Sequence, residues 1–144
     1  MTTEITTLEN PTEAELDQLM SIWLASNLDA HGFIDPHYWQ ANVPAVREAL
    51  GEAELIVAKN GPAIIGFAGL QGDFLAGLFV DATWRDRGIG GMLMAACQAV
   101  HARLALEVYV ANSRAGDFYL HHGFHVSGRT VDQGEPILEM AWHR

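Results

Sequence analysis

The chain has 144 residues, of which 49% are hydrophobic and 18% are charged, a balance typical of a folded globular protein. Its net charge of −10 disfavours nucleic acid as a partner, because phosphates are repelled over most of such a surface, and it favours a cationic substrate such as an amine. No apolar run reaches the length of a membrane span and no signal peptide is evident, so we expect no membrane association and a cytoplasmic location. We expect one domain over residues 1–144.

The chain is predicted to begin with a short strand and a helix. Residues 4–8 alternate weakly and are rich in threonine, which is typical of a strand. Thr12 can cap a helix, and Glu15 stands three residues later, where a capping box needs an acid. Apolar residues at helical spacing then extend this first helix to about Asn27.

A loop and a second helix follow. The helix is predicted from Tyr38 to about Leu50, and Pro44 either bends it or divides it. Aromatic and histidine side chains gather just before it and at its start. Four of them are candidates for binding a substrate, or else they only pack one helix onto the other: His31, Phe33, Tyr38 and Trp39.

Three apolar segments in the middle of the chain predict an antiparallel meander. Strands are expected at 54–58 and 64–70, and the Asn60-Gly61 pair between them is a strong hairpin signal. Another turn leads to a third, buried strand at 75–80.

The stretch that follows this third strand combines positive charge with glycine. Arg85 and Arg87 are two of only eight basic residues in the chain, and three glycines stand at 88, 90 and 91. Glycines allow several backbone N–H groups to converge on one point, and the start of the next helix directs its positive dipole end there. The stretch therefore predicts a seat for a phosphate or pyrophosphate, although a glycine-rich turn without a ligand has the same composition. The spacing matches neither a nucleoside-triphosphate P-loop nor a dinucleotide-binding loop.

The C-terminal half is predicted to alternate helices and strands. The expected elements are a helix from Gly90 to about Ala102, a strand at 104–110, a helix at 113–122, and strands at 124–130 and 137–142. Glu107 is the lone acid in the apolar strand 104–110, and a partly buried carboxylate gains basicity. It is a candidate catalytic base, or alternatively an outward-facing or structurally paired glutamate.

Two motifs in the expected order carry a resemblance to a known family. Arg85-x-x-Gly88-x-Gly90 resembles the acyl-CoA pyrophosphate loop of the GNAT acetyltransferases, and Asn112-x-x-Ala115-x-x-Phe118-Tyr119-x-x-x-Gly123-Phe124 resembles their second motif. The resemblance covers roughly residues 54–130. It implies an α/β (α+β) fold with a mixed, mostly antiparallel, V-splayed sheet of about six or seven strands flanked by about four helices. The splay is expected between strands 75–80 and 104–110.

The same resemblance implies acetyl-CoA as co-substrate and assigns site residues. No metal is expected, because His121, His122 and His125 lack cysteine or a paired acid in a recognised ligand pattern. Tyr119 matches the family tyrosine that protonates the departing thiolate, and Glu107 matches a glutamate that acts as base in the ribosomal-protein alanine acetyltransferases; a water relay is the alternative base. The cofactor-binding residues expected on this basis are Leu78, Phe79, Val80, Arg85, Asp86, Arg87, Gly88, Ile89, Gly90, Gly91, Asn112, Arg114, Ala115, Phe118 and Tyr119.

Two classes of function fit these features. The first is an N-acetyltransferase that moves acetyl directly from acetyl-CoA to a primary amine in a ternary complex; the amine belongs to a protein lysine, a peptide N-terminus or a small molecule. The second is a catalytically silent acyl-CoA-binding module, which has no need of the acid Tyr119. A homodimer is compatible with either class.

Overall fold

The computed structural model of the chain describes residues 2–144, which form four α-helices, one short 3-10 turn and seven strands. The first half contains β1 (Glu4–Leu8), α1 (Glu13–Ala30), α2 (Pro36–Glu52), β2 (Glu54–Asn60), β3 (Ala63–Gln71) and β4 (Phe74–Val80). The second half contains η1 (Ala82–Trp84), α3 (Ile89–Val100), β5 (Arg103–Tyr109), α4 (Ser113–His121), β6 (His125–Asp132) and β7 (Glu135–His143).

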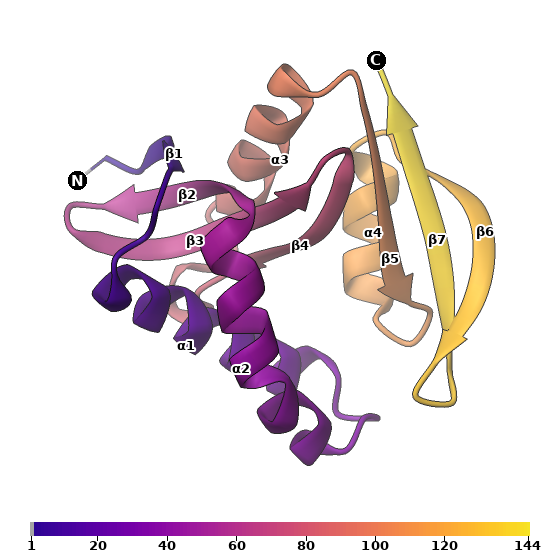
Figure 1. Cartoon of the computed structure of the whole chain (residues 1–144). Coiled ribbons are helices and arrows are strands. Elements are labelled where there is room, and N and C mark those ends of the chain that lie inside the picture. Colours follow the sequence, from indigo (N-terminus) through magenta and orange to yellow (C-terminus); the bar gives the residue numbers. More distant parts are fainter. Residues whose placement is uncertain (1) are drawn as a thin grey trace.

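The seven strands form one mixed sheet in the order β1-β2-β3-β4-β5-β7-β6. Neighbours pair antiparallel except β4 and β5, which are parallel. Within residues 2–144, β4 and β5 share a single pair, Phe74 with Ala105, and the two strands then diverge (Figure 1). The expected antiparallel meander, the V-shaped splay and its position in the chain are therefore confirmed.

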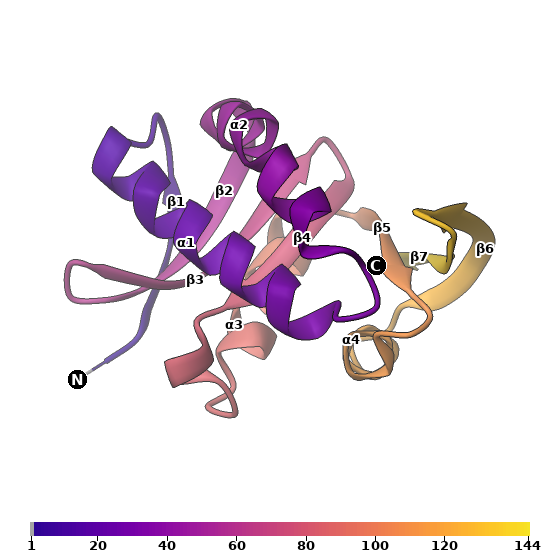
Figure 2. The same cartoon turned by 90° about the horizontal axis from the view of Figure 1, so that it is seen from below.

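The helices cover both faces of the sheet. Figure 2 shows α1 and α2 on one face of β1–β4, with α3 on the other. The alternation of β2 explains this layering, because successive side chains of a strand point to opposite faces. Leu55 and Val57 are buried with the residues of α1 and α2, whereas Ile56 and Ala58 are buried with those of α3.

The predicted start of α1 is correct, but its end is not. Thr12 and Glu15 form the expected reciprocal capping box. The helix continues past Asn27 to Ala30, because the backbone N–H of His31 still donates to the carbonyl of Asn27 at 3.0 Å and completes another turn. This extra turn carries the end of α1 toward β5 and α4.

The second helix also differs from the prediction. It begins at Pro36, where the proline occupies the first turn and the side chain of Asp35 caps His37 N–H at 2.9 Å. Pro44 lies inside α2 and does not divide it. The ring is exposed, so solvent can satisfy the backbone carbonyl that loses its helical partner.

The remaining boundaries agree with the expected ones to within about two residues. Asn112 caps α4 by accepting the backbone N–H of Ala115 at 3.3 Å, and Gly123 leaves that helix with φ +91°. None of the helices in residues 2–144 is both long enough and apolar enough to span a membrane.

Candidate active site

A cleft of about 1050 Å³ opens where β4 and β5 separate. One wall is β4 with the loop that leads into α3, and the other is β5 with α4. The end of α1, the loop after it, and parts of α2, β6 and β7 close one end. The cleft is therefore a consequence of the splay: two parallel strands that diverge leave a space that side chains from other elements line.

The start of α3 provides an anion-binding end to this cleft. Gly88 is the N-cap with φ +79°, and no side chain caps the helix. The first helical bond is donated by Met92 to the carbonyl of Gly88, so the N–H groups of the preceding turn have no intrahelical partner. Gly90 lies against the ring of Phe118, where an added Cβ would come within 3.3 Å. Uncapped N–H groups at a helix N-terminus are suited to a phosphate.

Of the three arginines near the start of α3, two line the cleft and one does not. Arg85 lines the cleft and donates to Asp29 of α1 at 2.7 Å, and Arg114 lines it and donates to Asp86 at 2.9 Å. Arg87 does not line the cleft, contrary to the prediction. Its guanidinium lies over the ring of Trp84, 4.8 Å from the centroid, in a cation–π contact.

The edge of β4 forms the long wall of the cleft. Leu78, Phe79 and Val80 are half-buried and line it. On the side toward β5, this part of β4 has no strand partner within residues 2–144, because the pairing ends at Phe74. Its backbone groups on that side are free to hydrogen-bond an extended ligand, as an added strand would.

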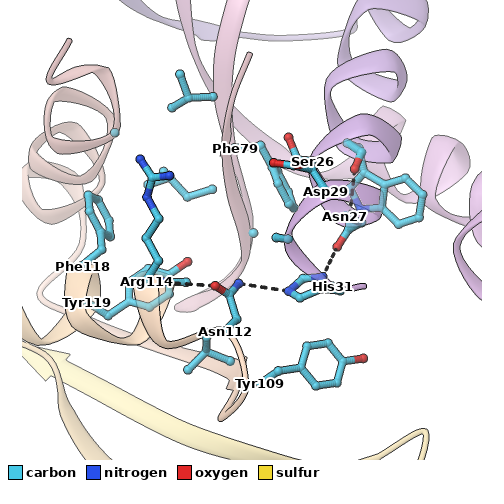
Figure 3. A pocket seen from close by; sticks show the side chains of 18 of the residues that line it. Ser26, Asn27, Asp29, His31, Phe79, Tyr109, Asn112, Arg114, Phe118 and Tyr119 are labelled. Atoms are coloured by element: carbon cyan, nitrogen blue, oxygen red, sulfur yellow. Dashed lines mark hydrogen bonds between the residues drawn. The ribbon is translucent and has the colours of Figure 1, made fainter. Parts of the chain in front are cut away.

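Tyr119 reaches the cleft from α4 (Figure 3). Its ring packs edge-on against Phe118 and Phe124, and none of the described residues hydrogen-bonds its hydroxyl. Burial, with a smaller contribution from Cys97, raises the pKa of Tyr119 to about 12. The hydroxyl therefore keeps its proton at neutral pH and is available as a donor.

Aromatic side chains and a histidine line the opposite end. His31 stacks on Trp39 with ring centroids 5.3 Å apart and meets Tyr109 edge-on at 4.9 Å. Of the four candidates for substrate binding, His31 and Trp39 line the cleft, whereas Phe33 and Tyr38 do not. Phe33 is exposed and packs against the outside of His31 and Tyr109.

Tyr38 instead takes part in a hydrogen-bonded group. Its hydroxyl donates to the carboxylate of Asp132 at 3.4 Å, and the hydroxyl of Tyr109 donates to the same oxygen at 2.8 Å. Burial and the nearby carboxylate both raise the pKa of each tyrosine. This group fastens the start of α2 to the end of β6.

Glu107 lines the cleft, and its side chain is exposed, because β5 turns Leu106 and Val108 into the core and Glu107 to the other face. Of the two alternatives left open by the sequence, the structure matches the outward-facing glutamate and not the partly buried one. Glu139 of β7 lies directly opposite in the sheet register and does not line the cleft.

Several lining residues were not expected from the sequence. Asn27, Tyr109 and Asp132 belong to this group. Asn27 had one signal: it continues the spacing of Met20 and Trp23 and thus falls on the buried face of α1. The other two lie near the ends of strands, and only the pairing of β5, β7 and β6 brings them together. Among residues 2–144, no three His, Cys, Asp or Glu residues are grouped to hold a metal ion.

Comparison with known proteins agrees with this geometry. The family model described as Acetyltransferase (GNAT) domain matches residues 51–126. The chain is 39% identical over 115 residues to the peptidyl-lysine N-acetyltransferase YiaC of Escherichia coli. The aligned region covers 78% of this chain and 79% of that protein. It is 33% identical over 133 residues to the peptidyl-lysine N-acetyltransferase YjaB of the same organism, covering 89% and 90%.

Solved structures share the whole architecture. The solution structure of apo YjaB from Escherichia coli superposes with a TM-score of 0.84 at 31% identity, over 99% of this chain and 98% of that one. The PaiA N-acetyltransferase of Thermoplasma acidophilum, crystallised with coenzyme A, has a TM-score of 0.81 over 100% of both chains; at 19% identity this likeness shows the fold alone. The chain belongs to the GNAT acetyltransferase family, and it is an N-acetyltransferase.

Proposed function

We propose that this enzyme transfers acetyl directly from acetyl-CoA to the side-chain amine of a lysine in a protein or peptide. The observation that carries the proposal is that the uncapped start of α3 and the hydroxyl of Tyr119 open into the same cleft. The names of YiaC and YjaB support lysine as the acceptor. The net charge of −10 supports a cationic acceptor, because it attracts lysine side chains.

The residues of the anion-binding end fit the pyrophosphate of acetyl-CoA. The N–H groups at the start of α3 donate hydrogen bonds to the pyrophosphate oxygens, and Arg85 adds a positive charge beside them. The pantetheine arm lies along Leu78–Val80, where the unpaired edge of β4 offers backbone donors and acceptors to its amides.

Tyr119 acts as the acid of the reaction. The neutral amine attacks the thioester carbonyl carbon, a C–N bond forms, the C–S bond breaks with its electron pair on sulfur, and the nitrogen releases its extra proton to solvent to give the amide. The Tyr119 hydroxyl hydrogen-bonds the developing thiolate and donates its proton to it, and solvent then returns a proton to the phenolate. Because its pKa is raised, the Tyr119 hydroxyl is protonated at the start of each turnover.

The acceptor amine must lose a proton before it attacks, because a lysine amine has an ordinary pKa of about 10.4. Glu107 receives this proton, directly or through water. Its carboxylate lines the cleft on the face of β5 that also carries Tyr109, and its exposure gives water access to it.

The test is thiol release from acetyl-CoA with lysine peptides, N-terminal peptides and small amines, using variants of both groups. We expect release with lysine peptides, a fall in kcat of at least about tenfold in Tyr119→Phe, and an unchanged Kd for coenzyme A. Glu107→Gln should lower kcat/KM by about tenfold or more, whereas the matched variant Glu139→Gln should leave it unchanged.

Three results would contradict parts of the proposal. Release confined to small amines or peptide N-termini would exclude lysine as the acceptor. Full activity in Tyr119→Phe would exclude Tyr119 as the acid. Equal effects of the two glutamate variants would mean that Glu107 contributes only surface charge.

A further inference from the structure

A continuous chain of hydrogen bonds crosses the cleft from α4 to α1 (Figure 3). The backbone nitrogen of Ala115 lies 3.3 Å from Asn112 Oδ1, and Asn112 Nδ2 lies 3.1 Å from His31 Nε2. His31 Nδ1 lies 3.1 Å from Asn27 Oδ1, and Asn27 Nδ2 lies 2.9 Å from the carbonyl oxygen of Trp23. These hydrogen bonds join the β5–α4 wall of the cleft to the end that α1 closes.

The two ends of this chain determine the direction of every bond. The backbone N–H of Ala115 can only donate, so Asn112 turns its oxygen to it and its NH₂ group to His31. The carbonyl of Trp23 can only accept, so Asn27 turns its NH₂ group there and its oxygen to His31. His31 therefore accepts at Nε2 and donates from Nδ1, which defines a neutral imidazole with its proton on Nδ1.

We propose that His31 is a positioning residue of the acetyl-transfer site, which holds Asn112 in place only while its imidazole is neutral. Protonation places an N–H at Nε2, where it faces the NH₂ group of Asn112. Asn112 can restore that bond only by rotating its amide, and rotation takes its oxygen from the N–H of Ala115. The cap of α4, the helix that carries Tyr119, is then lost. This inference rests on the proposed function.

The rings and acids around His31 favour its neutral form. Trp39 of α2 covers one face, and Tyr109 of β5 meets the edge with its hydroxyl already donated to Asp132. Glu107, two residues before Tyr109 on the same face of β5, is exposed. Burial among these groups lowers the pKa of His31. The bond to Asn112 is therefore intact at neutral pH and breaks on acidification.

The charged side chains nearest the hydrogen-bond chain on α1 and α4 are paired with other residues. Asp29 of α1 accepts from Arg85 at 2.7 Å, and Arg114 of α4 donates to Asp86 at 2.9 Å. No described carboxylate lies within salt-bridge distance of the His31 ring to stabilise an imidazolium.

Two substitutions separate hydrogen bonding from titration. His31→Gln keeps one acceptor and one donor but has no pKa in the accessible range, and His31→Phe keeps the ring packing but removes both bonds. Protonation of the acceptor amine lowers activity gradually with falling pH in every variant, and we expect wild-type kcat to show a further step of decline as the pH falls through the pKa of His31. His31→Gln should stay within about threefold of wild type at about pH 8 and lack this further step, whereas His31→Phe should lose about tenfold throughout.

Each contrary result has its own meaning. An unchanged further step in His31→Gln overturns the proposal, because another group then controls it. Wild-type activity in His31→Phe overturns it as well. A loss of about 100-fold in His31→Gln, with activity rising steadily with pH, makes His31 the proton acceptor instead and equally overturns a positioning role.

The tautomer can be measured without catalysis or ligand. Long-range ¹H–¹⁵N spectra of the histidine rings, with His31→Gln to assign the signals, should show His31 protonated at Nδ1 and unprotonated at Nε2. A proton on Nε2 overturns the proposal even if His31→Phe fails to fold. If the protein shows the expected tautomer but acetylates no lysine peptide, the proposed function is contradicted. The hydrogen bonds of His31 are then still supported.

Discussion

The two ends of the cleft are built in different ways. The anion-binding end, which we propose binds the acetyl donor and call the donor end, comes mainly from one short segment, the loop after β4 and the first turn of α3, with its uncapped backbone N–H groups. The opposite end, which we propose binds the amine and call the acceptor end, is assembled from side chains of α1, α2, β5, β6 and β7 that are far apart in the sequence. A donor site of this kind is set by glycine positions, whereas an acceptor site depends on how whole elements pack. Substitutions should therefore act on one end without changing the other.

The largest expected effect is at the donor end. Gly90→Val places a branched side chain against Phe118, where even a Cβ would come within 3.3 Å, and beside the N–H groups that receive phosphate. We expect the Kd for coenzyme A to rise by about 30- to 100-fold, measured by calorimetry. Gly51→Ala, where an added Cβ meets open space, is the matched control and should leave that Kd unchanged. Equal affinities in Gly90→Val and Gly51→Ala would mean that the phosphate lies elsewhere.

A smaller effect at the same end is expected from charge. Arg85→Gln removes a guanidinium that lines the cleft, and the Kd for coenzyme A should rise by about tenfold, less at high salt. Asp29→Asn should lower this Kd, because the phosphate no longer competes with a carboxylate for Arg85. Arg103→Gln, an exposed site away from the cleft, controls for net charge. An equal change in Arg103→Gln would reduce the role of Arg85 to long-range attraction.

At the acceptor end, Tyr109→Phe should raise KM for the lysine peptide about threefold while the Kd for coenzyme A stays constant. The variant removes the 2.8 Å bond to Asp132 and should lower the free energy of unfolding by about 1–2 kcal/mol, measured in urea. Tyr38→Phe removes the longer 3.4 Å bond to the same carboxylate, so it should cost less stability. A larger loss in Tyr38→Phe than in Tyr109→Phe would contradict this assignment.

The smallest effect concerns a histidine outside the cleft. Burial lowers the pKa of His101, but its hydrogen bonds to Glu54 and Asp73 outweigh burial and raise the pKa overall. Its contribution to stability is therefore present below the ordinary histidine pKa of about 6.5 and is lost as the pH rises through the folded value. His31 has the opposite sign: its pKa is lowered, so its contribution is present above about 6.5 and is lost on acidification.

Urea midpoints on either side of neutrality should show this contrast. His101→Gln should weaken the decline of stability with rising pH, and His31→Gln should weaken the decline with falling pH. The same pH dependence in both variants would contradict the two assignments.

The same contrast between local and assembled sites explains what the sequence could predict. Gly88, Gly90 and Asn112 act on backbone groups close to them in the chain, so their spacing alone was informative. Arg87 was misplaced because its contact with Trp84 depends on how η1 turns. The alternation of β5 was readable, but not which face would be covered, so the sequence could not decide between a partly buried and an outward-facing Glu107.

The acceptor end shows the limit most clearly. His31 and Trp39 were candidates only because aromatic residues gather before α2, and nothing separated them from Phe33 and Tyr38. The partners of His31, Asn27 and Asn112, are 4 and 81 residues away along the chain. A hydrogen bond over the longer of these separations depends on the splay angle of the sheet, which no local pattern encodes.

Phe74 with Ala105 is the single pair between β4 and β5 within residues 2–144, so the two parts of the sheet share little backbone hydrogen bonding. A donor molecule bound along the unpaired edge of β4, as we propose, would take the place of a missing strand and stabilise the fold as well as take part in the reaction. By mass action, coenzyme A at about 100 times its Kd adds about 2.7 kcal/mol to the free energy of unfolding. The enzyme is therefore expected to be more stable with its donor bound than after the product has left.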